Sequence, residues 1–288
     1  MEIMNGKELS SKIKDEIKDE IESCFKTPIL AVITIGYNAA SEVYIKNKKK
    51  ACEYVGMSLL HFDYVDSVKE KVVINKIKEL NDDENVSGII LQLPIPEEFD
   101  SKRIINTISP LKDVDGLTES SVSKMYFGED GLIPCTPKGI LELLDHYNIS
   151  LTGKHVVIVG RSNLVGKPLM IECLKRDATV TVCHSKTENL SHFTSQADIL
   201  IVATGQKYLI DKDMVKEGSV IVDVGISRED GKLYGDVNPN VSEKCSYLTP
   251  VPGGVGPMTV AMLVKNTLIA YKKINNQQKN SWKFFKSF

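Results

Sequence analysis

The chain has 288 residues, with 36 lysines and arginines against 38 aspartates and glutamates, and a net charge of −2. This length favours two domains. The balance of charge argues against a nucleic-acid-binding protein, which normally carries a basic excess. No hydrophobic stretch is long enough to span a membrane, and residues 1–17 are typical of an amphipathic helix rather than a signal peptide. We therefore expect a cytoplasmic protein that binds neither nucleic acid nor membranes.

The six cysteines are scattered along the chain without a C-x-x-C pair, and most lie beside apolar residues. This distribution predicts buried, reduced thiols rather than disulfides or zinc ligands. The five histidines show no H-x-x-x-H spacing, so we expect no metal site.

The first half of the chain predicts alternating elements. After the opening helix the pattern indicates strand, helix, strand, helix and strand, at residues 28–36, 41–56, 58–65, 67–81 and 86–96. Such alternation implies parallel strands joined by crossover helices, in an α/β fold. Ligands bind beyond the carboxyl ends of parallel strands, which places Gln92 at the mouth of a crevice. The prolines at 94 and 96 are equally typical of a strand that simply ends.

The helix at 41–56 carries a run of lysines, and a charge run is usually a solvated face. At about 100° per residue, however, Lys48 lies one turn after Tyr44 on the apolar side. The other members of that side are Ala51, Cys52 and Val55, whereas Lys46 and Lys50 lie opposite. A lysine among apolar residues must be desolvated, extended to solvent or paired. Lys48 is therefore the candidate functional lysine of the run.

The second half begins with a loop that feeds a helix within 132–149, with Thr136 as the N-cap and Pro137 as the first helical residue. A strand, a glycine turn, a helix and a strand follow within 153–185. Two more strands and a helix are predicted at 197–205, at 218–227 and from near Thr259 onward. The polar tail, residues 275–288, is typical of a frayed chain end.

The glycine turn, VVIVGRSNLVGKP (156–168), approaches the dinucleotide-binding pattern G-x-G-x-x-G but departs from it. Ser162 occupies the place of the second glycine, and Gly166 comes one residue late. Gly160 still permits a tight turn, and amides at the start of the next helix can face an anion. A strand-to-helix turn without a ligand remains the alternative.

The strand after this turn indicates which dinucleotide would fit. NAD enzymes commonly place an acidic residue at its end, to bind the ribose hydroxyl. Here the strand ends in His184, Ser185 and Lys186, and Arg161 lies in the glycine turn. A cation and a hydroxyl in place of a carboxylate favour a 2′-phosphate, hence NADP.

Taken together, these segments resemble the bifunctional methylenetetrahydrofolate dehydrogenase/methenyltetrahydrofolate cyclohydrolases. The resemblance covers nearly the whole chain and includes, in the order of that family, ASEVYIKNKKKACEYVGM, GIILQLPIP, KDVDGL, PCTPKGILELL, VVIVGRSNLVGKP, CHSKT, ATG and TPVPGGVGPMT. One departure is the segment 118–128, where an asparagine and a glycine common in the family are not in their usual places.

The resemblance implies a fold of two α/β domains. Residues 1–118, completed by the C-terminal helix 259–288, would form the catalytic folate-binding domain, and residues 138–258 a Rossmann-like NADP-binding domain. Folate would bind between them, in a homodimer. The implied reactions are oxidation of 5,10-methylenetetrahydrofolate with NADP and hydrolysis of the methenyl product to 10-formyltetrahydrofolate, in one-carbon metabolism.

The resemblance also implies roles for individual residues. Lys48 would be the catalytic lysine, Tyr44 would stack on the substrate, Gln92 would tune the lysine and Asp115 would bind the pterin. The cofactor would be lined by Gly160, Arg161, Ser162, Ser185 and Ile226. Further folate contacts would come from the loop at 252–257, with Pro252, Gly253, Gly254 and Val255.

The chemistry of these residues agrees with the implied roles. Loss of the hydride leaves a methenyl cation, and a permanently positive neighbour would disfavour its formation. Partial burial disfavours the charged form of a lysine. A neutral lysine can act as a base when water attacks. A carboxylate at Asp115 suits the N–H donors of a pterin, although an Asp-Gly turn is an equally good reading of the residues alone.

Three alternatives stay open at this point. The chain could be a dehydrogenase-only member of the same family, or an NADP-binding sensor without activity, which would need the turn but not Lys48, Gln92 or Asp115. A short-chain dehydrogenase also uses a Y-x-x-x-K pair, but there the pair follows the glycine turn, whereas Tyr44 precedes Gly160 by more than a hundred residues.

Overall fold

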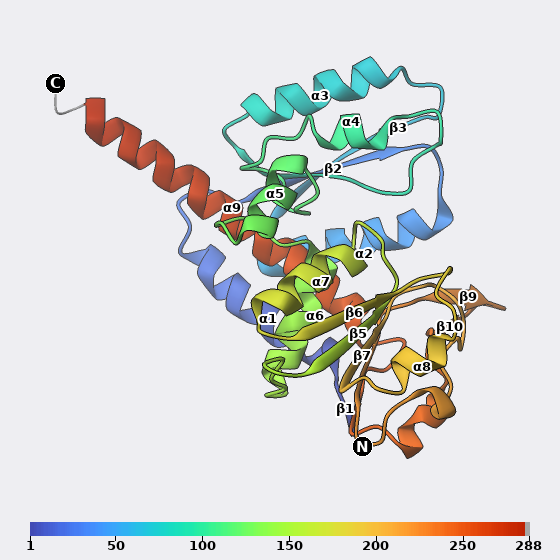
Figure 1. Cartoon of the computed structure of the whole chain (residues 1–288). Helices are drawn as coiled ribbons and strands as arrows, with labels where there is room; N and C mark the ends of the chain where they lie inside the picture. The colour runs from blue at the N-terminus through green and yellow to red at the C-terminus, as the bar shows by residue number, and fades with distance from the viewer. Residues whose placement is uncertain (286–288) are drawn as a thin grey trace. The chain divides into compact units, whose positions relative to one another are not determined.

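The computed structural model describes residues 1–285 of the chain. The chain forms two compact units (Figure 1). Unit 1 holds Met1–Ser11, Met125–Glu129 and Thr136–Thr259, and unit 2 holds Lys12–Lys124, Asp130–Cys135 and the chain from Val260 onward. The helices α1 (Gly6–Glu22), α5 (Glu119–Phe127) and α9 (Val255–Phe285) contribute residues to both units, and α6 (Cys135–His146) does so through its first residue.

Unit 2 is built on a parallel three-stranded sheet in the order β3-β2-β4. Its strands are β2 (Ile29–Ile35), β3 (Ser58–Tyr64) and β4 (Val86–Leu91). The crossover helices are α2 (Ala39–Val55) and α3 (Glu70–Asp82), followed by the short α4 (Ser101–Ile105). Helices α3 and α4 cover one face of the sheet and α2 lies on the other (Figure 1). The predicted parallel arrangement is confirmed.

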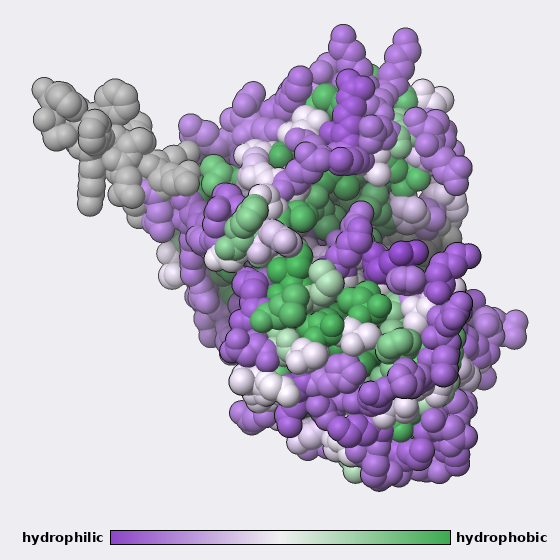
Figure 2. All heavy atoms as spheres, in the orientation of Figure 1, coloured by the Kyte–Doolittle hydropathy of each residue, from purple (hydrophilic) through white to green (hydrophobic). Residues whose placement is uncertain are grey.

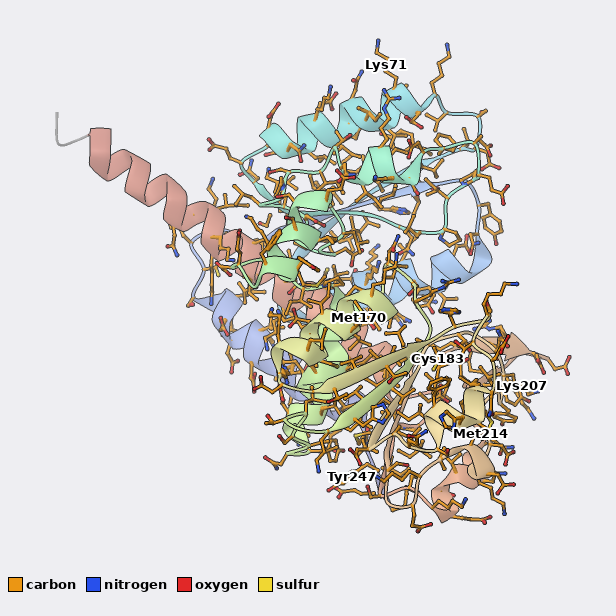
Figure 3. All side chains as sticks on the ribbon, in the orientation of Figure 1. Lys71, Met170, Cys183, Lys207, Met214 and Tyr247 are labelled. Carbon is orange, nitrogen blue, oxygen red and sulfur yellow. The ribbon has the colours of Figure 1, made fainter. Side chains whose placement is uncertain are left out.

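The core of unit 2 lies between the sheet and α3. Val73, Ile77 and Leu80 recur at helical spacing on the buried side of α3 and pack on Ile33 and Ile89 of the sheet. The opposite side of α3 is polar in Figure 2, and Lys71 points away from the sheet in Figure 3. Burial of this apolar stripe stabilises the helix more than its intrinsic propensity does.

Unit 1 is built on a parallel six-stranded sheet in the order β1-β11-β8-β7-β5-β6. Its strands are β1 (Glu2–Ile3), β5 (His155–Val159), β6 (Thr179–Cys183), β7 (Ile199–Val202), β8 (Val220–Asp223) and β11 (Tyr247–Leu248). The chain places β6 on one side of β5 and β7 on the other. Such a reversal of strand order marks the point where doubly wound sheets bind their ligands, at the carboxyl ends of β5 and β7.

The remaining elements of unit 1 cover this sheet or connect its strands. Helices α6 (Cys135–His146) and α7 (Gly166–Lys175) lie on one face, and α8 (Leu190–Thr194) on the other (Figure 1). An antiparallel hairpin of β9 (Ser227–Glu229) and β10 (Lys232–Tyr234) follows β8. Two 3₁₀ turns, η1 (Lys212–Met214) and η2 (Pro239–Glu243), complete the unit.

Two predicted helix starts are wrong by a few residues. Helix α9 begins at Val255 rather than near Thr259. Pro257 lies in its first turn, where the missing N–H has no helical acceptor to lose. Helix α6 begins at Cys135, and the hydroxyl of Thr136 is hydrogen-bonded to the hydroxyl of Thr259 at 3.0 Å rather than serving as the predicted N-cap.

The C-terminal segment and the divergent segment are both helical. Helix α9 continues to Phe285, so the tail predicted to fray is helical over most of its length, and residues 286–288 lie outside the described residues. The departure from the family pattern at 118–128 coincides with α5. Thr118 starts this helix, because its hydroxyl oxygen accepts from the Ser121 amide at 3.2 Å.

All six cysteines are free thiols, and five of them are buried. The predicted burial is confirmed for these five, whereas Cys24 is half-buried. Over the described residues, no helix combines the length and apolar character that a membrane span requires.

Candidate active site

Within helix α2, Lys48 differs in burial and in hydrogen bonding from the lysines near it in the sequence. Lys48 is half-buried, and its Nζ donates to Oε1 of Gln92 at 2.7 Å. Lys46 and Lys50 are exposed. The predicted difference in burial within the run is therefore confirmed, and the partner of the half-buried lysine is the glutamine at the end of β4.

Tyr44 differs in burial from the other residues on its side of α2. Ala51, Cys52 and Val55 are buried as expected, but the Tyr44 side chain is 44% exposed. The buried residues of α2 lie in its second half, and no residue from 42 to 50 is fully buried. Tyr44 has the angular position of the apolar stripe but lies about 10 Å along the helix axis from Ala51. Its ring is accordingly available for contact with a ligand.

Gln92 is held in a defined orientation. Its backbone N–H donates to Ile33 O at 2.8 Å, which continues the strand ladder past the end of β4. Its side-chain Nε2 donates to Leu93 O at 2.6 Å. With the amide nitrogen bonded to the backbone, Oε1 is the atom presented to Lys48. Gln92 thus gives the ammonium group of Lys48 a neutral acceptor instead of a carboxylate.

Asp115 lies in the same neighbourhood. Burial raises the pKa of its carboxyl group, and the positive charge of Lys48 and a hydrogen bond from the Cys135 thiol act in the opposite direction. Burial also raises the pKa of Cys52, one turn after Lys48, to about 12. The thiol is therefore protonated at neutral pH, and the nearby groups that can carry charge in a reaction are Lys48 and Asp115.

The loop that carries Asp115 is held from within unit 2 by residues that the sequence did not reveal. Lys112 is 5% exposed, and its Nζ donates to three carbonyl oxygens at the end of α3, those of Leu80, Asn81 and Asp83, at 2.7–2.8 Å. This interaction caps α3 with a cation, where the helix dipole favours one. Lys112 and Asp115 are three residues apart, so the cap fixes the start of the Asp115 loop.

Two further residues, Asp113 and Asn266, hold this loop through hydrogen bonds to its backbone. Asp113 is buried and accepts from the amides of Leu117 and Thr118 at 3.2 and 2.8 Å. Asn266 of α9 is buried and donates to Val114 O at 2.9 Å and to Ile133 O at 3.0 Å. The signal in the sequence was a lone asparagine in the apolar run of the last helix, which requires a buried partner.

The glycine turn of unit 1 has the backbone geometry that its sequence predicts. Gly160 has a φ of +127°, and a Cβ there would overlap the carbonyl oxygen of Ala203 at the end of β7. A Cβ on Gly166 would overlap the carbonyl oxygen of Gly160. Despite its late position, Gly166 therefore permits the close approach of helix and strand that the third glycine of the dinucleotide pattern provides.

Arg161 and Ser162 are exposed at the tip of this turn. The hydroxyl oxygen of Ser162 accepts from the Val165 amide at 3.1 Å, and its carbonyl oxygen accepts from the Lys167 amide at 3.1 Å. Ser162 thus shapes the turn in place of the second glycine, while the Arg161 guanidinium is free to face an anion.

Ser185 is exposed in a turn directly after β6, whose last residue, Cys183, is labelled in Figure 3. The turn is closed by His184: its amide donates to Thr187 Oγ1 at 2.8 Å, and its Nδ1 accepts from the Lys186 amide at 3.2 Å. The hydroxyl of Ser185 and the ammonium group of Lys186 are left at the tip, without an acidic residue between them.

The last predicted site residues lie after β8 and before α9. The Ile226 side chain is 40% exposed. In the loop at 252–257, Gly253 O accepts from the Lys7 amide at 2.8 Å, and Pro252 is exposed. Gly254 and Val255 are buried. Direct contacts of this loop with a ligand would therefore come from Pro252 and Gly253, with Val255 as their support in the core.

Comparison with known proteins gives matches over nearly the whole chain. Residues 4–115 match the catalytic domain of tetrahydrofolate dehydrogenase/cyclohydrolase, and residues 134–275 match its NAD(P)-binding domain. The chain is 52% identical over 277 residues to the bifunctional protein FolD of Aquifex aeolicus, covering 94% of this chain and 95% of that one.

Solved structures agree with this assignment. The bifunctional dehydrogenase/cyclohydrolase of Campylobacter jejuni has a TM-score of 0.93 and 46% identity, covering 95% of this chain and 99% of the other. The Trypanosoma brucei enzyme, complexed with NADP and an inhibitor, has a TM-score of 0.90 and 31% identity, covering 94% and 97%. Both domains of tetrahydrofolate dehydrogenase/cyclohydrolase match the sequence of the chain, its fold consists of two parallel α/β units, and a relative is 52% identical over nearly the whole chain. The chain therefore belongs to the tetrahydrofolate dehydrogenase/cyclohydrolase family.

Proposed function

We propose that the protein oxidises 5,10-methylenetetrahydrofolate to the 5,10-methenyl compound with NADP and hydrolyses that product to 10-formyltetrahydrofolate. The observation that carries the proposal is the group formed by Lys48, Gln92 and Asp115 in a chain of this family. Lys48 is half-buried and bonded to Gln92 Oε1 at 2.7 Å, and its charge acts on Asp115. A sensor without activity would need none of these three side chains.

Lys48 is the proton-transferring residue in this proposal. In the hydrolytic step water adds to the methenyl carbon, a ring C–N bond opens and a proton is released. The Lys48 amine is placed to transfer that proton, and Gln92 Oε1 fixes its position by accepting one of its N–H bonds. Because Gln92 is neutral, it orients the amine without stabilising the ammonium form as a carboxylate would.

Asp115 is the substrate-anchoring residue, and Tyr44 supplies a stacking surface. The amino group and ring N–H of a pterin are donors, and a carboxylate with two acceptor oxygens matches them. The raised pKa of Asp115 also allows its carboxyl group to exchange a proton with the pterin. The exposed Tyr44 ring lies one helical turn before Lys48 and can stack on the aromatic part of the substrate.

Unit 1 has the features of a site for NADP, which when bound accepts the hydride. The turn at Gly160 lies at the carboxyl end of β5, next to the point of strand reversal. Ser185 and Lys186 are exposed after β6, and Arg161 is exposed in the turn. A hydroxyl and two cations suit a 2′-phosphate, and the structure of the Trypanosoma brucei relative contains NADP.

The remaining parts of the proposal concern organisation. We propose a homodimer in the cytoplasm, with residues 1–118 and 259–288 as the folate-binding domain and 138–258 as the NADP-binding domain. Sedimentation would measure the number of chains, and limited proteolysis would locate the domain boundaries.

A spectrophotometric assay tests the proposed reactions. Purified protein with 5,10-methylenetetrahydrofolate and NADP should form NADPH, and protein with the methenyl compound alone should consume it. A protein that forms NADPH but does not consume the methenyl compound would be a dehydrogenase-only member. Binding of NADP without either reaction would show a sensor.

A further inference from the structure

Two buried aspartates of unit 1 have no role in the site described above. Asp223 ends β8 and is 4% exposed, and Asp236 follows β10 and is fully buried. Burying two carboxyl groups beside each other is unfavourable unless each is hydrogen-bonded. Their hydrogen bonds show what the pair holds in place.

Asp236 binds the turn that follows β7. Its Oδ2 accepts from the Thr204 amide at 2.5 Å, from the Thr204 hydroxyl at 2.9 Å and from the Gly205 amide at 3.1 Å. Three donors on one oxygen suit an acceptor of high charge density, such as a carboxylate. The other oxygen, Oδ1, is buried and accepts none of the hydrogen bonds found among the described residues.

Asp223 in turn binds the backbone that carries Asp236. Its Oδ1 accepts from the Asp236 amide at 2.9 Å, and its Oδ2 accepts from the Val237 amide at 3.0 Å. The Asp223 amide donates to Thr249 Oγ1 at 2.7 Å. The bonds therefore form a chain from the end of β8, through Asp223 and Asp236, to the turn after β7.

Two glycines make room for this arrangement: Gly225 lies beside the carboxylate of Asp236, and Gly235 lies beside the carboxylate of Asp223. A Cβ on Gly225, two residues after Asp223, would overlap the carboxyl group of Asp236. A Cβ on Gly235, directly before Asp236, would overlap the carboxyl group of Asp223. Gly225 directly precedes Ile226, so the carboxyl group of Asp236 also packs against the segment that carries this proposed cofactor contact.

The two segments held in this way flank the place where a dinucleotide is expected. Thr204 and Gly205 follow β7, one of the two strands at the point of strand reversal, and Gly160 follows the other. We propose that Asp236, supported by Asp223, is a positioning residue for the dinucleotide, because it fixes Thr204, Gly205 and Ile226 without touching the ligand. This inference rests on the proposed function of unit 1 as an NADP site.

The test measures NADP binding and the two activities on the full-length protein. Asp236→Ala leaves the amides of Thr204 and Gly205 without their acceptor, so we expect the Kd for NADP, measured by calorimetry, to rise at least about tenfold. Hydrolysis of the methenyl compound uses no NADP and should stay within about twofold. This retained activity distinguishes a misplaced cofactor loop from an unfolded protein.

A conservative variant and a matched control complete the test. Asp236→Asn keeps one oxygen for the three donors, so it should restore NADP binding to within about threefold of the parent. Asp198 lies before β7, at its opposite end, where it accepts from the His155 amide at 2.9 Å and from Lys216 Nζ at 2.6 Å. Asp198→Ala should lower stability without a change in the Kd for NADP.

The outcomes separate this inference from the function on which it rests. A parent protein that does not bind NADP would overturn the proposed function. A parent that binds NADP, together with an Asp236→Ala protein that binds it equally well, would overturn the positioning role alone. Equal losses in Asp198→Ala and Asp236→Ala would also overturn it, since both would then act through general stability.

Discussion

Asp115 in unit 2 and Asp223 in unit 1 are aspartates whose pKa burial raises, but their surroundings differ. Asp115 is half-buried and faces the charge of Lys48 and the thiol of Cys135. Asp223 is 4% exposed and is bound by backbone amides, with the carboxyl group of Asp236 as its charged neighbour. Burial alone therefore does not identify a reactive carboxyl group. A neighbouring cation and partial access to solvent distinguish the residue suited to bind a substrate from the residue that holds a loop.

The same contrast holds for the two sites as wholes. In unit 2 the proposed chemistry depends on side chains, Lys48, Gln92 and Asp115, which long-range contacts bring together. In unit 1 the proposed cofactor site depends on backbone turns after parallel strands, with glycines at positions where a Cβ would collide. We therefore expect substitutions in unit 2 to change rates and those in unit 1 to change cofactor binding or stability.

The largest expected effect is that of Lys48→Met. Methionine keeps most of the length of the side chain and suits a half-buried position, but the proton-transferring amine is lost. Cyclohydrolase activity should fall by about a hundred- to ten-thousand-fold. Dehydrogenase activity should fall less, because hydride transfer depends more on positioning than on a base. Rates of methenyl consumption and of NADPH formation measure the two losses.

Lys46→Met and Lys50→Met are the matched controls for this prediction, since both lysines lie on the same helix and are exposed. Each should stay within about twofold of the parent, as surface substitutions usually have small effects. Comparable losses at Lys48 and Lys50 would show that the run acts as a charged patch.

Asp115→Ala should have the next largest effect. Without the carboxylate the pterin loses its anchor, and a misplaced substrate of this kind costs about a hundredfold in rate. Both activities should therefore fall at least that far, while calorimetry should still detect NADP binding by unit 1. Near-normal turnover would return Asp115 to the role of a turn residue.

The contribution of Asp223 to stability should depend on pH. Burial raises its pKa from 3.8 to about 7, amides of Val237, Asp236 and Gly225 oppose this rise, and the charge of Asp236 adds to it. Between pH 3.8 and about pH 7, Asp223 holds a proton in the folded protein that it has lost in the unfolded chain. The free energy of unfolding therefore falls as pH rises through this range. The expected loss is about 2 kcal/mol between pH 5 and pH 7, roughly thirtyfold in the folding equilibrium.

Urea unfolding at several pH values measures this contribution as a difference between the parent and Asp223→Asn. The variant has no carboxyl group at this position, so its stability should lack this part of the pH dependence, although it will be less stable overall because one amide donor meets an NH₂ group. Parallel pH profiles of the two proteins would contradict the assignment of the raised pKa to Asp223.

The smallest expected effect is that of Ser185→Asp on cofactor choice. A carboxylate after β6 would repel a 2′-phosphate and offer an acceptor to a ribose hydroxyl. The kcat/KM for NADP should fall about tenfold, roughly the effect of 1.4 kcal/mol, and preference should shift toward NAD. The other hydroxyl of this turn, that of Thr187, already accepts a hydrogen bond from the His184 amide, so the substitution is made at Ser185. A parent protein with equal kcat/KM for NAD and NADP would contradict the assignment of NADP.

The sequence by itself determined the alternation of strands and helices, the parallel sheets, the special backbone at Gly160 and the difference between Lys48 and its neighbours. These are local properties: hydrophobic periodicity sets the element, and a glycine marks a turn that other residues disfavour. The helix starts at Cys135 and Val255 were missed because proline is compatible with several positions of a first turn, so that local signals do not fix the boundary.

Only the tertiary structure decided which distant residues act together. Tyr44 is exposed although it shares the angular position of the buried residues of α2, because burial along a helix depends on what packs against each part of it, which periodicity does not encode. Lys112 caps a helix 29 to 32 residues away, and Asn266 reaches a loop 152 residues away. Asp236 reaches the turn after β7 from the chain that follows β8, because the strand order places the ends of β7 and β8 side by side. A buried polar group needs its partner wherever the chain supplies one, and sequence distance does not constrain that choice.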